Sequence, residues 1–325
     1  MTTAVPTRRL GPHGPEVPTF ALGSWNIWDR ISRDEAIALV LRAQRTGAAF
    51  FDVGNYNMGP HDEGARTDIL FGEIVREAGL HREDYLLCGK LWLWDYPNTS
   101  FAGWMRESLD RIGIERADCI VVGDHMAPVD IRRVVADMQA EIDAGRFAYW
   151  GINNWPYEEA VLALDFAEAE GLTPPSFAQL KYGLARRSMA EGPFYGELFR
   201  RGRMSLQASD IFEGGILVGK TSPQRKIGAD VGGIRDAIIA SWPRAQAIAA
   251  EIEATPAQLN IAYCLANPAT ANVLFGASSV AQLDDALGAF DVLERVGAER
   301  LRELCADLWV DRDVNPDGTW APPAS

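Results

Sequence analysis

Eight short apolar runs alternate along the chain with stretches that have the periodicity of amphipathic helices. Several of these runs are apolar at four or more consecutive positions, which is typical of parallel strands buried on both faces. The runs cover residues 20–25, 48–54, 85–92, 119–124, 147–154, 177–182, 204–210 and 272–278. This alternation predicts parallel strands that are joined by helical crossovers.

Capping residues mark where several of the intervening helices begin. Ser32 and Glu35 have the spacing of a capping box. Residues 128–130 open a second helix, and Thr255 followed by Pro256 is an N-cap with proline at the first helical position. Eight strand–helix units predict an α/β fold of the (β/α)8 TIM-barrel type with right-handed connections.

The chain is longer than a minimal barrel. Its 325 residues exceed the roughly 250 that such a fold needs. About 60 residues, partly Gly-rich and basic, separate the seventh and eighth apolar runs, which predicts a long loop with an extra helix at the mouth of the barrel. The polar, turn-rich end at about 309–325 predicts a C-terminal tail or lid. Since neither a repeat nor a linker interrupts the pattern, residues 1–325 are expected to form one domain.

The charge balance excludes several classes of partner. The chain has 31 Lys and Arg against 45 Asp and Glu, a net charge of −14, which disfavours nucleic acids and anionic membranes. No apolar run reaches the roughly 18–20 residues of a membrane span, and the first residues lack the apolar stretch of a secretory signal. We therefore expect a cytoplasmic protein that acts on a small molecule.

The cysteines indicate neither disulfides nor a metal site. Cys88, Cys119, Cys264 and Cys305 are widely scattered, and no CxxC pair occurs. We expect them to be small core residues in a reducing compartment.

Polar side chains at the ends of the apolar runs are the candidates for chemistry, because barrel enzymes place catalytic residues at the carboxyl ends of their strands. These positions are Trp25, Asp52, Lys90, Asp124, Asn153, Asn154, Gln179, Asp210 and Ser278. Asp52 and Lys90 follow neighbouring strands and are predicted to pair, since a lone buried charge is costly. The pair either closes the barrel mouth structurally or lowers the pKa of a nearby acid, for which the Tyr56 phenol is available.

The chain resembles the aldo-keto reductases, NAD(P)-dependent oxidoreductases with a (β/α)8 fold, and most nearly their bacterial and potassium-channel accessory-subunit branch. The resemblance covers nearly all of residues 8–290 and is carried by seven motifs in the expected order. They are LGSW at 22–25, FFDVGNY at 50–56, GKLW at 89–92, AGRFAYWGINNW at 144–155, QLKYGLARR at 179–187, EGGILVGK at 213–220 and FGASSVAQLDDAL at 275–287.

The resemblance implies a catalytic tetrad of Asp, Tyr, Lys and His. Asp52 and Lys90 match it. The family usually has its tyrosine five residues after the aspartate, whereas Tyr56 follows by four and Asn57 stands in the expected position. Either residue therefore remains a candidate for the acid, with Tyr56 preferred.

The histidine of the tetrad is displaced. The family position falls on Gly123, and the candidate replacements are His125 and Asp124. An aspartate in this place would favour a cationic or hydroxyl-rich substrate.

The resemblance also implies residues that hold the nicotinamide. A carboxamide needs one hydrogen-bond acceptor and one donor, which the amides of Asn153, Asn154 and Gln179 supply. The resemblance puts the aromatic residue that usually stacks on the nicotinamide at the position of Ser209. The further positions that the resemblance places at the cofactor are Gly23, Ser24, Trp25, Asp210 and Phe212.

At the adenosine end of the dinucleotide the match is partial. The resemblance implies contacts from Gly276, Ser278, Gln282 and Asp285, with Ala286 in place of an adenine-contacting asparagine. Ser278 and the following residue open a helix, which is a favourable phosphate site as well as an N-cap. NADP(H) is expected more than NAD(H), and the basic residues in the long loop are Lys220, Arg225 and Lys226.

Tryptophans follow the ends of several apolar runs, and five around one rim predict an aromatic-lined pocket for a flat or apolar-faced substrate. They are Trp25, Trp28, Trp92, Trp94 and Trp155.

Three functions agree with these features. The first is hydride transfer between a nicotinamide and a carbonyl or alcohol (an aldehyde, ketone or sugar), with Tyr56 as proton donor. The second is a redox-neutral lyase, dehydratase or epimerase on the same barrel. The third is a cofactor-binding protein with vestigial catalysis.

Overall fold

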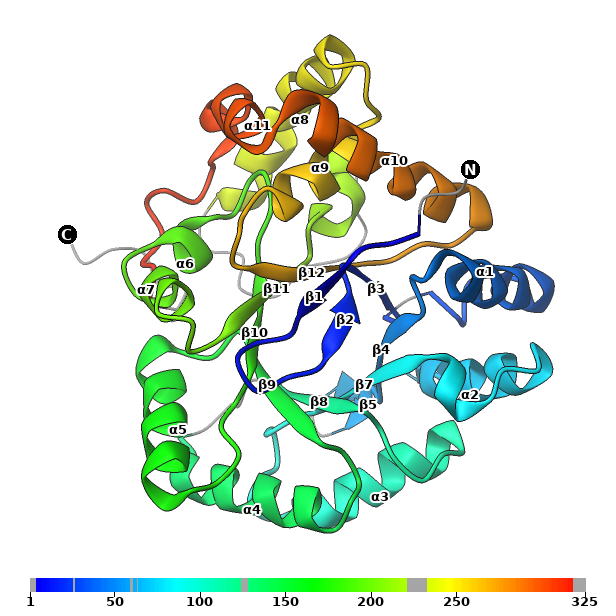
Figure 1. Ribbon diagram of the computed structural model, residues 1–325, viewed down its shortest axis with the longest axis vertical. Coiled ribbons are helices and arrows are strands. Elements are labelled where there is room, and N and C mark those ends of the chain that lie inside the picture. The colour runs from blue at the N-terminus through cyan, green and yellow to red at the C-terminus, as the bar shows by residue number, and fades with distance from the viewer. Residues whose placement is uncertain are drawn as a thin grey trace.

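Eight parallel strands form a closed barrel in the computed structural model, which describes residues 4–317 apart from 26, 59, 60, 63, 124–127 and 221–232. The strands lie at the centre with helices around them (Figure 1). In barrel order they are β3 (Phe20–Gly23), β4 (Phe50–Gly54), β7 (Leu86–Leu91), β8 (Cys119–Val122), β9 (Tyr149–Asn153), β10 (Phe177–Lys181), β11 (Ser205–Ser209) and β12 (Thr270–Phe275). Seven of them lie within a predicted apolar run, and β12 begins two residues before the run predicted at 272–278, which confirms the predicted fold class.

The helices form the outer layer of the barrel, and most follow a barrel strand directly in the chain. They are α1 (Arg33–Thr46), α2 (Thr67–Glu77), α3 (Phe101–Ile112), α4 (Ile131–Asp143), α5 (Tyr157–Glu170), α6 (Ser188–Glu191), α7 (Tyr195–Arg200), α8 (Ile234–Glu251), α9 (Pro256–Leu265), α10 (Val280–Val296) and α11 (Ala298–Leu304). Short 3-10 turns are η1 (Arg82–Asp84), η2 (Glu213–Val218) and η3 (Ala306–Leu308).

The predicted helix starts are confirmed by their capping geometry. Ser32 and Glu35 form a reciprocal capping box at α1, and Thr255 forms one at α9 with Pro256 at the first helical position. The Asp130 carboxylate accepts hydrogen bonds from the first backbone N–H groups of α4. These contacts fix where each helix leaves the end of its strand.

The inward-facing side chains of the barrel are apolar at the end where the strands begin, which we call the floor. They are polar at the end where the strands finish, which we call the mouth. On β4 and β10 the inward positions run from Phe50 to Asp52 and from Phe177 to Gln179, since every second residue of a strand shares a face. The antiparallel hairpin of β1 (Thr7–Arg9) and β2 (Glu16–Pro18) lies across the floor in Figure 1. Its Val17 packs among the floor residues and closes that end of the barrel.

Two long segments lie outside the repeating pattern. The connection from β11 to β12 contains η2, α8 and α9, which agrees with the predicted long loop with extra helix. After η3 the chain runs back over the loop that follows β10, where buried Asp311 accepts backbone hydrogen bonds from Arg187 (2.9 Å) and Ser188 (3.2 Å). A second small hairpin, β5 (Asn57–Met58) with β6 (His61–Asp62), follows β4.

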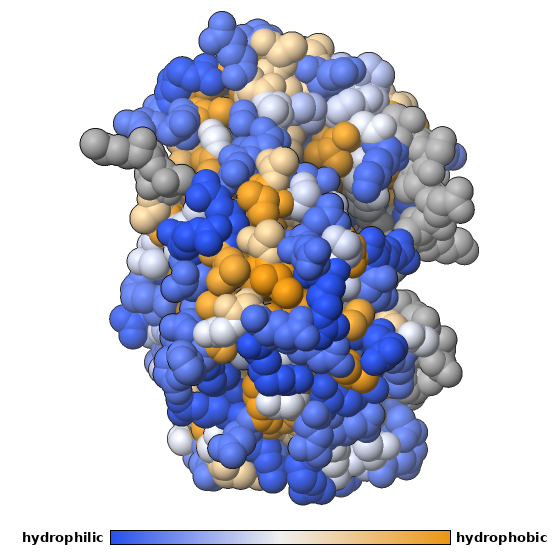
Figure 2. Space-filling model, turned by 90° about the vertical axis from the view of Figure 1, so that its right-hand side faces the viewer, coloured by the Kyte–Doolittle hydropathy of each residue, from blue (hydrophilic) through white to orange (hydrophobic). Residues whose placement is uncertain are grey.

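On the side of the molecule that Figure 2 shows, hydrophilic residues surround a smaller area of apolar ones. Within the described residues, each helix is too short or too polar to cross a membrane. The four cysteines are free and buried, as predicted from their apolar surroundings.

Candidate active site

The predicted pairing of Asp52 and Lys90 is present at the mouth of the barrel. These residues lie on the neighbouring strands β4 and β7 and are 2% and 7% exposed. The Lys90 ammonium nitrogen lies 3.5 Å from Asp52 Oδ1. Two opposite charges taken out of water together are mutually compensated, so the pair can persist in the barrel interior.

The surroundings of Lys90 keep its side chain charged. Burial has the largest single effect and favours the neutral amine, but the combined influence of Asp52, Tyr56, Cys88 and Asp210, with Asp52 the largest of the four, outweighs it and raises the pKa of Lys90 above its usual range. The barrel mouth therefore holds a fixed positive charge beside Tyr56.

Tyr56 lies on the Lys90 side of the barrel mouth and is 7% exposed. A Cβ added to Gly54 would lie 3.3 Å from both the Tyr56 hydroxyl oxygen and Lys90 Cβ, so the phenol reaches across the bare backbone of this glycine. Its ring stacks on Trp25 with centroids 5.8 Å apart and lies 6.1 Å from Trp92. The Tyr56 phenol and the Lys90 side chain therefore both lie beside the same glycine.

Asn57, the alternative acid from the spacing, faces another way. Its side-chain amide accepts a hydrogen bond from the Ala65 backbone N–H (2.8 Å) and donates one to the Ala65 carbonyl. Its own backbone N–H donates to Asn55 Oδ1 at 3.0 Å. These contacts stabilise the loop after β4 and occupy the Asn57 side chain. Of the two candidate acids, Tyr56 is therefore the one whose side chain lies beside Gly54 and Lys90.

Trp92 fills the space beside Gly123, where the resemblance puts the histidine of the tetrad. A Cβ at position 123 would lie 2.3 Å from the Trp92 ring, so a larger residue would require the indole to move. The indole is fixed by a 3.1 Å hydrogen bond from Nε1 to the Asn55 carbonyl, and the Lys90 ammonium lies 5.5 Å from its ring centre. The candidate replacements His125 and Asp124 lie outside the described residues.

The predicted tryptophan rim is smaller than five residues. Trp92 and Trp94 stack with centroids 4.3 Å apart next to Tyr56 and Trp25. Trp28 and Trp155 are 2% and 0% exposed and pack in the core instead. Their predicted place in a pocket was wrong, because Trp28 is covered by Phe51 and Phe71, and Trp155 by Trp150 and other core residues.

The residues predicted at the nicotinamide form one hydrogen-bonded group. Asn153 Nδ2 donates to Gln179 Oε1 at 3.0 Å, and Asn154 Oδ1 accepts from the Lys181 backbone N–H at 3.1 Å. In the described part of the chain, Asn153 Oδ1 and Asn154 Nδ2 have no protein partner. They offer the one acceptor and one donor that a carboxamide needs, so this edge of the mouth fits a nicotinamide.

Other predicted cofactor residues lie at the ends of β3 and β11. The buried Ser24 joins the end of β3 to β4, since its N–H donates to the Asp52 carbonyl (2.9 Å) and its hydroxyl accepts from the Gly54 N–H (3.3 Å). Gly23 ends β3 directly before it. Asp210 has a positive φ of 52° after β11, and half-buried Phe212 lies 6.1 Å from the Phe275 ring. Ser209 leaves this edge without the usual stacking aromatic.

Three of the residues predicted at the adenosine end make hydrogen bonds within the protein. Ser278 donates from both its N–H (2.8 Å) and its hydroxyl (3.1 Å) to Gln282 Oε1. The Asp285 carboxylate accepts from the Thr255 hydroxyl and from Gln258, both at 2.9 Å, and so locks α10 to the start of α9. Gly276 is exposed. Of the three basic residues predicted in the long loop, Lys220 is exposed, and Arg225 and Lys226 lie outside the described residues.

A second buried ion pair, Arg186 with Glu213, lies close to Asp210, whose carbonyl accepts a hydrogen bond from the Glu213 N–H (2.8 Å). The Arg186 guanidinium is 3.0 Å from both carboxylate oxygens of Glu213. Burial raises the pKa of Glu213 to about 7, although the positive charge of Arg186 opposes this shift. Sequence reasoning missed the pair, because Arg186 and Glu213 follow different strands and each stands in an apolar or glycine-rich motif.

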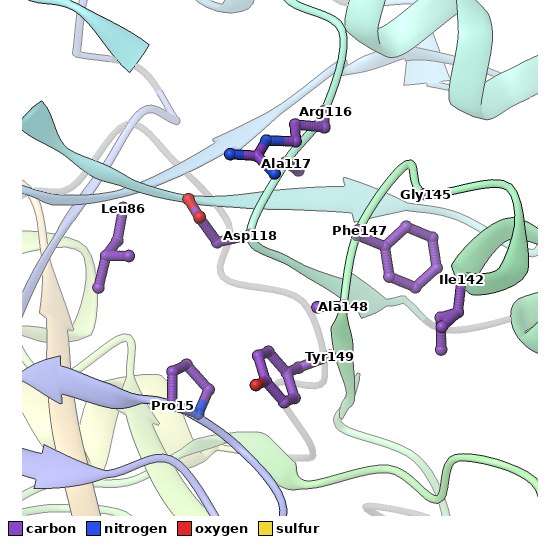
Figure 3. Close-up of a pocket in the computed structure, with 10 residues that line it drawn as sticks. All are labelled: Pro15, Leu86, Arg116, Ala117, Asp118, Ile142, Gly145, Phe147, Ala148 and Tyr149. Carbon is purple, nitrogen blue, oxygen red and sulfur yellow. The ribbon is translucent and has the colours of Figure 1, made fainter. Parts of the chain in front are cut away.

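A hollow of about 390 Å³ lies at the opposite end of the barrel from this site. Figure 3 shows Pro15 of the floor hairpin, Asp118 and Tyr149 around it. Because these residues precede or begin strands, the hollow is remote from the carboxyl ends where barrel chemistry takes place.

Comparison with known proteins shows the family of the chain. The sequence pattern of the Aldo/keto reductase family matches residues 19–304, and the chain belongs to this family of nicotinamide-dependent oxidoreductases. A probable voltage-gated potassium channel subunit beta of Arabidopsis thaliana is 26% identical over 307 residues, which are 88% of this chain and 91% of that protein.

Proposed function

We propose that the protein transfers hydride between a nicotinamide cofactor and a carbonyl or alcohol substrate such as an aldehyde, ketone or sugar. The observation that carries the proposal is the position of the Tyr56 hydroxyl across Gly54 from Lys90, with Asp52 paired to the ammonium at 3.5 Å. Family membership supports the reaction class.

Each of the three residues has a separate task in this reaction. Tyr56 gives its phenolic proton to the substrate oxygen during reduction and takes it back during oxidation. Lys90 favours the phenolate form through its fixed positive charge, and Asp52 keeps Lys90 charged and in place. A bound nicotinamide supplies or accepts the hydride.

Asn153 and Asn154 are the proposed holders of the nicotinamide carboxamide, through Oδ1 and Nδ2 respectively. The family resemblance favours NADP(H) over NAD(H). Separate titrations with NADPH and NADH, followed by quenching of tryptophan fluorescence, test this choice, since Trp25 and Trp92 lie beside the site. Tighter binding of NADH would overturn the NADP(H) assignment.

Substitution of the acid tests the role of Tyr56. We expect Tyr56→Phe to lower kcat by about 100-fold or more while dinucleotide binding is retained, because the ring remains and only the proton donor is lost. Turnover equal to that of the wild type would reject Tyr56 as the acid.

A second candidate is a cofactor-binding protein with little catalysis. Trp92 occupies the room of the tetrad histidine, and the channel-subunit name of the Arabidopsis relative favours this alternative. It predicts dinucleotide binding without turnover across a broad carbonyl panel. A redox-neutral reaction would instead consume substrate with no net change in reduced nicotinamide.

A further inference from the structure

Gln179 lies at the centre of the charged network, and every hydrogen-bonding position of its amide is occupied. Its Oε1 accepts from the Lys90 ammonium at 2.9 Å and from Asn153 Nδ2 at 3.0 Å. Its Nε2 donates to Asp52 Oδ2 at 2.8 Å and to Gln207 Oε1 at 2.6 Å. An amide has two lone pairs and two N–H groups, so none is left for a further ligand.

The two charges determine which way the amide of Gln179 is turned. An ammonium can only donate and a carboxylate can only accept, so the oxygen must face Lys90 and the nitrogen must face Asp52. If the amide were rotated by 180°, its N–H groups would face the Lys90 ammonium, which is also a donor, and its oxygen would face the Asp52 carboxylate, which is also an acceptor. Gln179 is 1% exposed, and hydrogen bonds to charged groups are stronger than those between neutral groups.

The hydrogen-bonded network extends from Gln179 on β10 to Gln207 on the neighbouring strand β11. Gln207 is fully buried on β11 in direct register with Gln179, and it presents its oxygen to Gln179 Nε2. The network thus joins β7 and β4 to β10 and β11 through neutral amides. Gln207 was missed in the sequence, although its position two residues before Ser209 puts it on the inward face of the strand.

We infer that Gln179 is a positioning residue for the Asp52–Lys90 pair, and that it is not a ligand of the cofactor carboxamide. The inference rests on the proposed function for its catalytic consequence. Gln179 holds the ammonium 3.5 Å from Asp52, short of full contact, and so keeps positive charge directed at Tyr56. Carboxamide recognition then falls to Asn153 and Asn154.

Loss of Gln179 has a defined effect on Tyr56. Without Oε1, the ammonium is drawn onto Asp52 and away from the phenol, so the phenol ionises at higher pH. Among the described residues, the titratable groups that act on Lys90 are Asp52 from β4, Tyr56 from the loop after it, Cys88 from β7 and Asp210 after β11.

The experiment compares Gln179→Met with the wild type in two independent measurements. One is the Kd for NADPH from tryptophan quenching. The other is the tyrosinate absorbance titration of the protein without cofactor, from which the titration of Tyr56→Phe is subtracted to isolate Tyr56. We expect the Kd to change less than about threefold and the Tyr56 titration to move up by roughly half a unit or more.

The opposite pattern would overturn the inference. A Kd raised about tenfold or more with an unmoved Tyr56 titration would make Gln179 a carboxamide ligand. Because the tyrosinate titration needs neither cofactor nor turnover, its result holds even if the protein proves not to be an oxidoreductase.

Two further variants distinguish loss of the network from a general effect of substitution in the barrel interior. Gln207→Met removes one acceptor but keeps Gln179, so a smaller shift of the Tyr56 titration in the same direction is expected. Asn272→Val, at a position in register with Gln207, is the control, since Asn272 makes no side-chain hydrogen bond within the described residues. A shift in the control as large as that in Gln207→Met would contradict the network.

Discussion

Trp92 and Gly123 form a matched pair at the scale of single residues. The indole lies where the Cβ of any larger residue at 123 would be, and it is tied to the Asn55 carbonyl by a 3.1 Å hydrogen bond. A histidine cannot be restored at position 123 while Trp92 keeps this place. The packing at position 123 therefore depends on two residues rather than one.

A double-mutant cycle tests this pairing. We expect Gly123→His to destabilise the protein by roughly 1–3 kcal/mol, because it overpacks a filled space. In the Trp92→Ala background the same substitution should cost less, since the space is then open. Unfolding in urea measures both costs, and equal costs in the two backgrounds would contradict the pairing.

Glu213 shows how a short element can make stability depend on pH. It lies at the start of η2, is fully buried and has a pKa raised by burial to about 7, above its usual value of 4.5. The folded protein therefore binds a proton at Glu213 that the unfolded chain releases between these values. Its contribution to stability is present below about pH 4.5 and is lost as the pH rises through about 7.

Glu213→Gln should remove this dependence. Between about pH 5 and about pH 8 the wild type is expected to lose on the order of 1–3 kcal/mol of unfolding free energy through Glu213, and the variant is expected to lose less. Urea unfolding at the two pH values measures the difference. The exposed Glu251→Gln is the control, and a profile of Glu213→Gln identical to the wild type would reject the assignment.

The C-terminal segment stabilises the whole molecule by joining its end to the loop after β10. Asp311, at 1% exposure, accepts from the backbone N–H groups of Arg187 and Ser188, and the Asp317 carbonyl accepts from the Tyr157 N–H at 2.7 Å. These contacts connect the end of the chain to segments more than a hundred residues earlier.

Asp311→Ala should lower the free energy of unfolding by roughly 1–3 kcal/mol, because it leaves buried backbone donors without an acceptor. The exposed Asp313→Ala, two residues further on, should leave stability nearly unchanged. Thermal or urea unfolding compares them, and equal stability of the two variants would show that the segment is not fastened through Asp311.

The barrel could be predicted because its signals are local. Continuous apolar runs such as residues 119–122 and capping pairs such as Ser32 with Glu35 are legible in the sequence. The hairpin of β1 and β2 could not be predicted, because both strands have only three residues, TRR and EVP, and neither has an alternating pattern of apolar and polar residues. The pairing of Asp52 with Lys90 followed from strand adjacency, whereas the full occupancy of Gln179 depends on side chains from four strands.

The most direct test of the proposed function follows the absorbance of reduced nicotinamide with wild type and Tyr56→Phe side by side, against a panel of aldehydes, ketones and sugars. We expect oxidation of the cofactor in proportion to the carbonyl reduced, with a rate about 100-fold or more lower in the variant. A wild-type protein that binds the cofactor but oxidises none of it across the panel would contradict the oxidoreductase assignment.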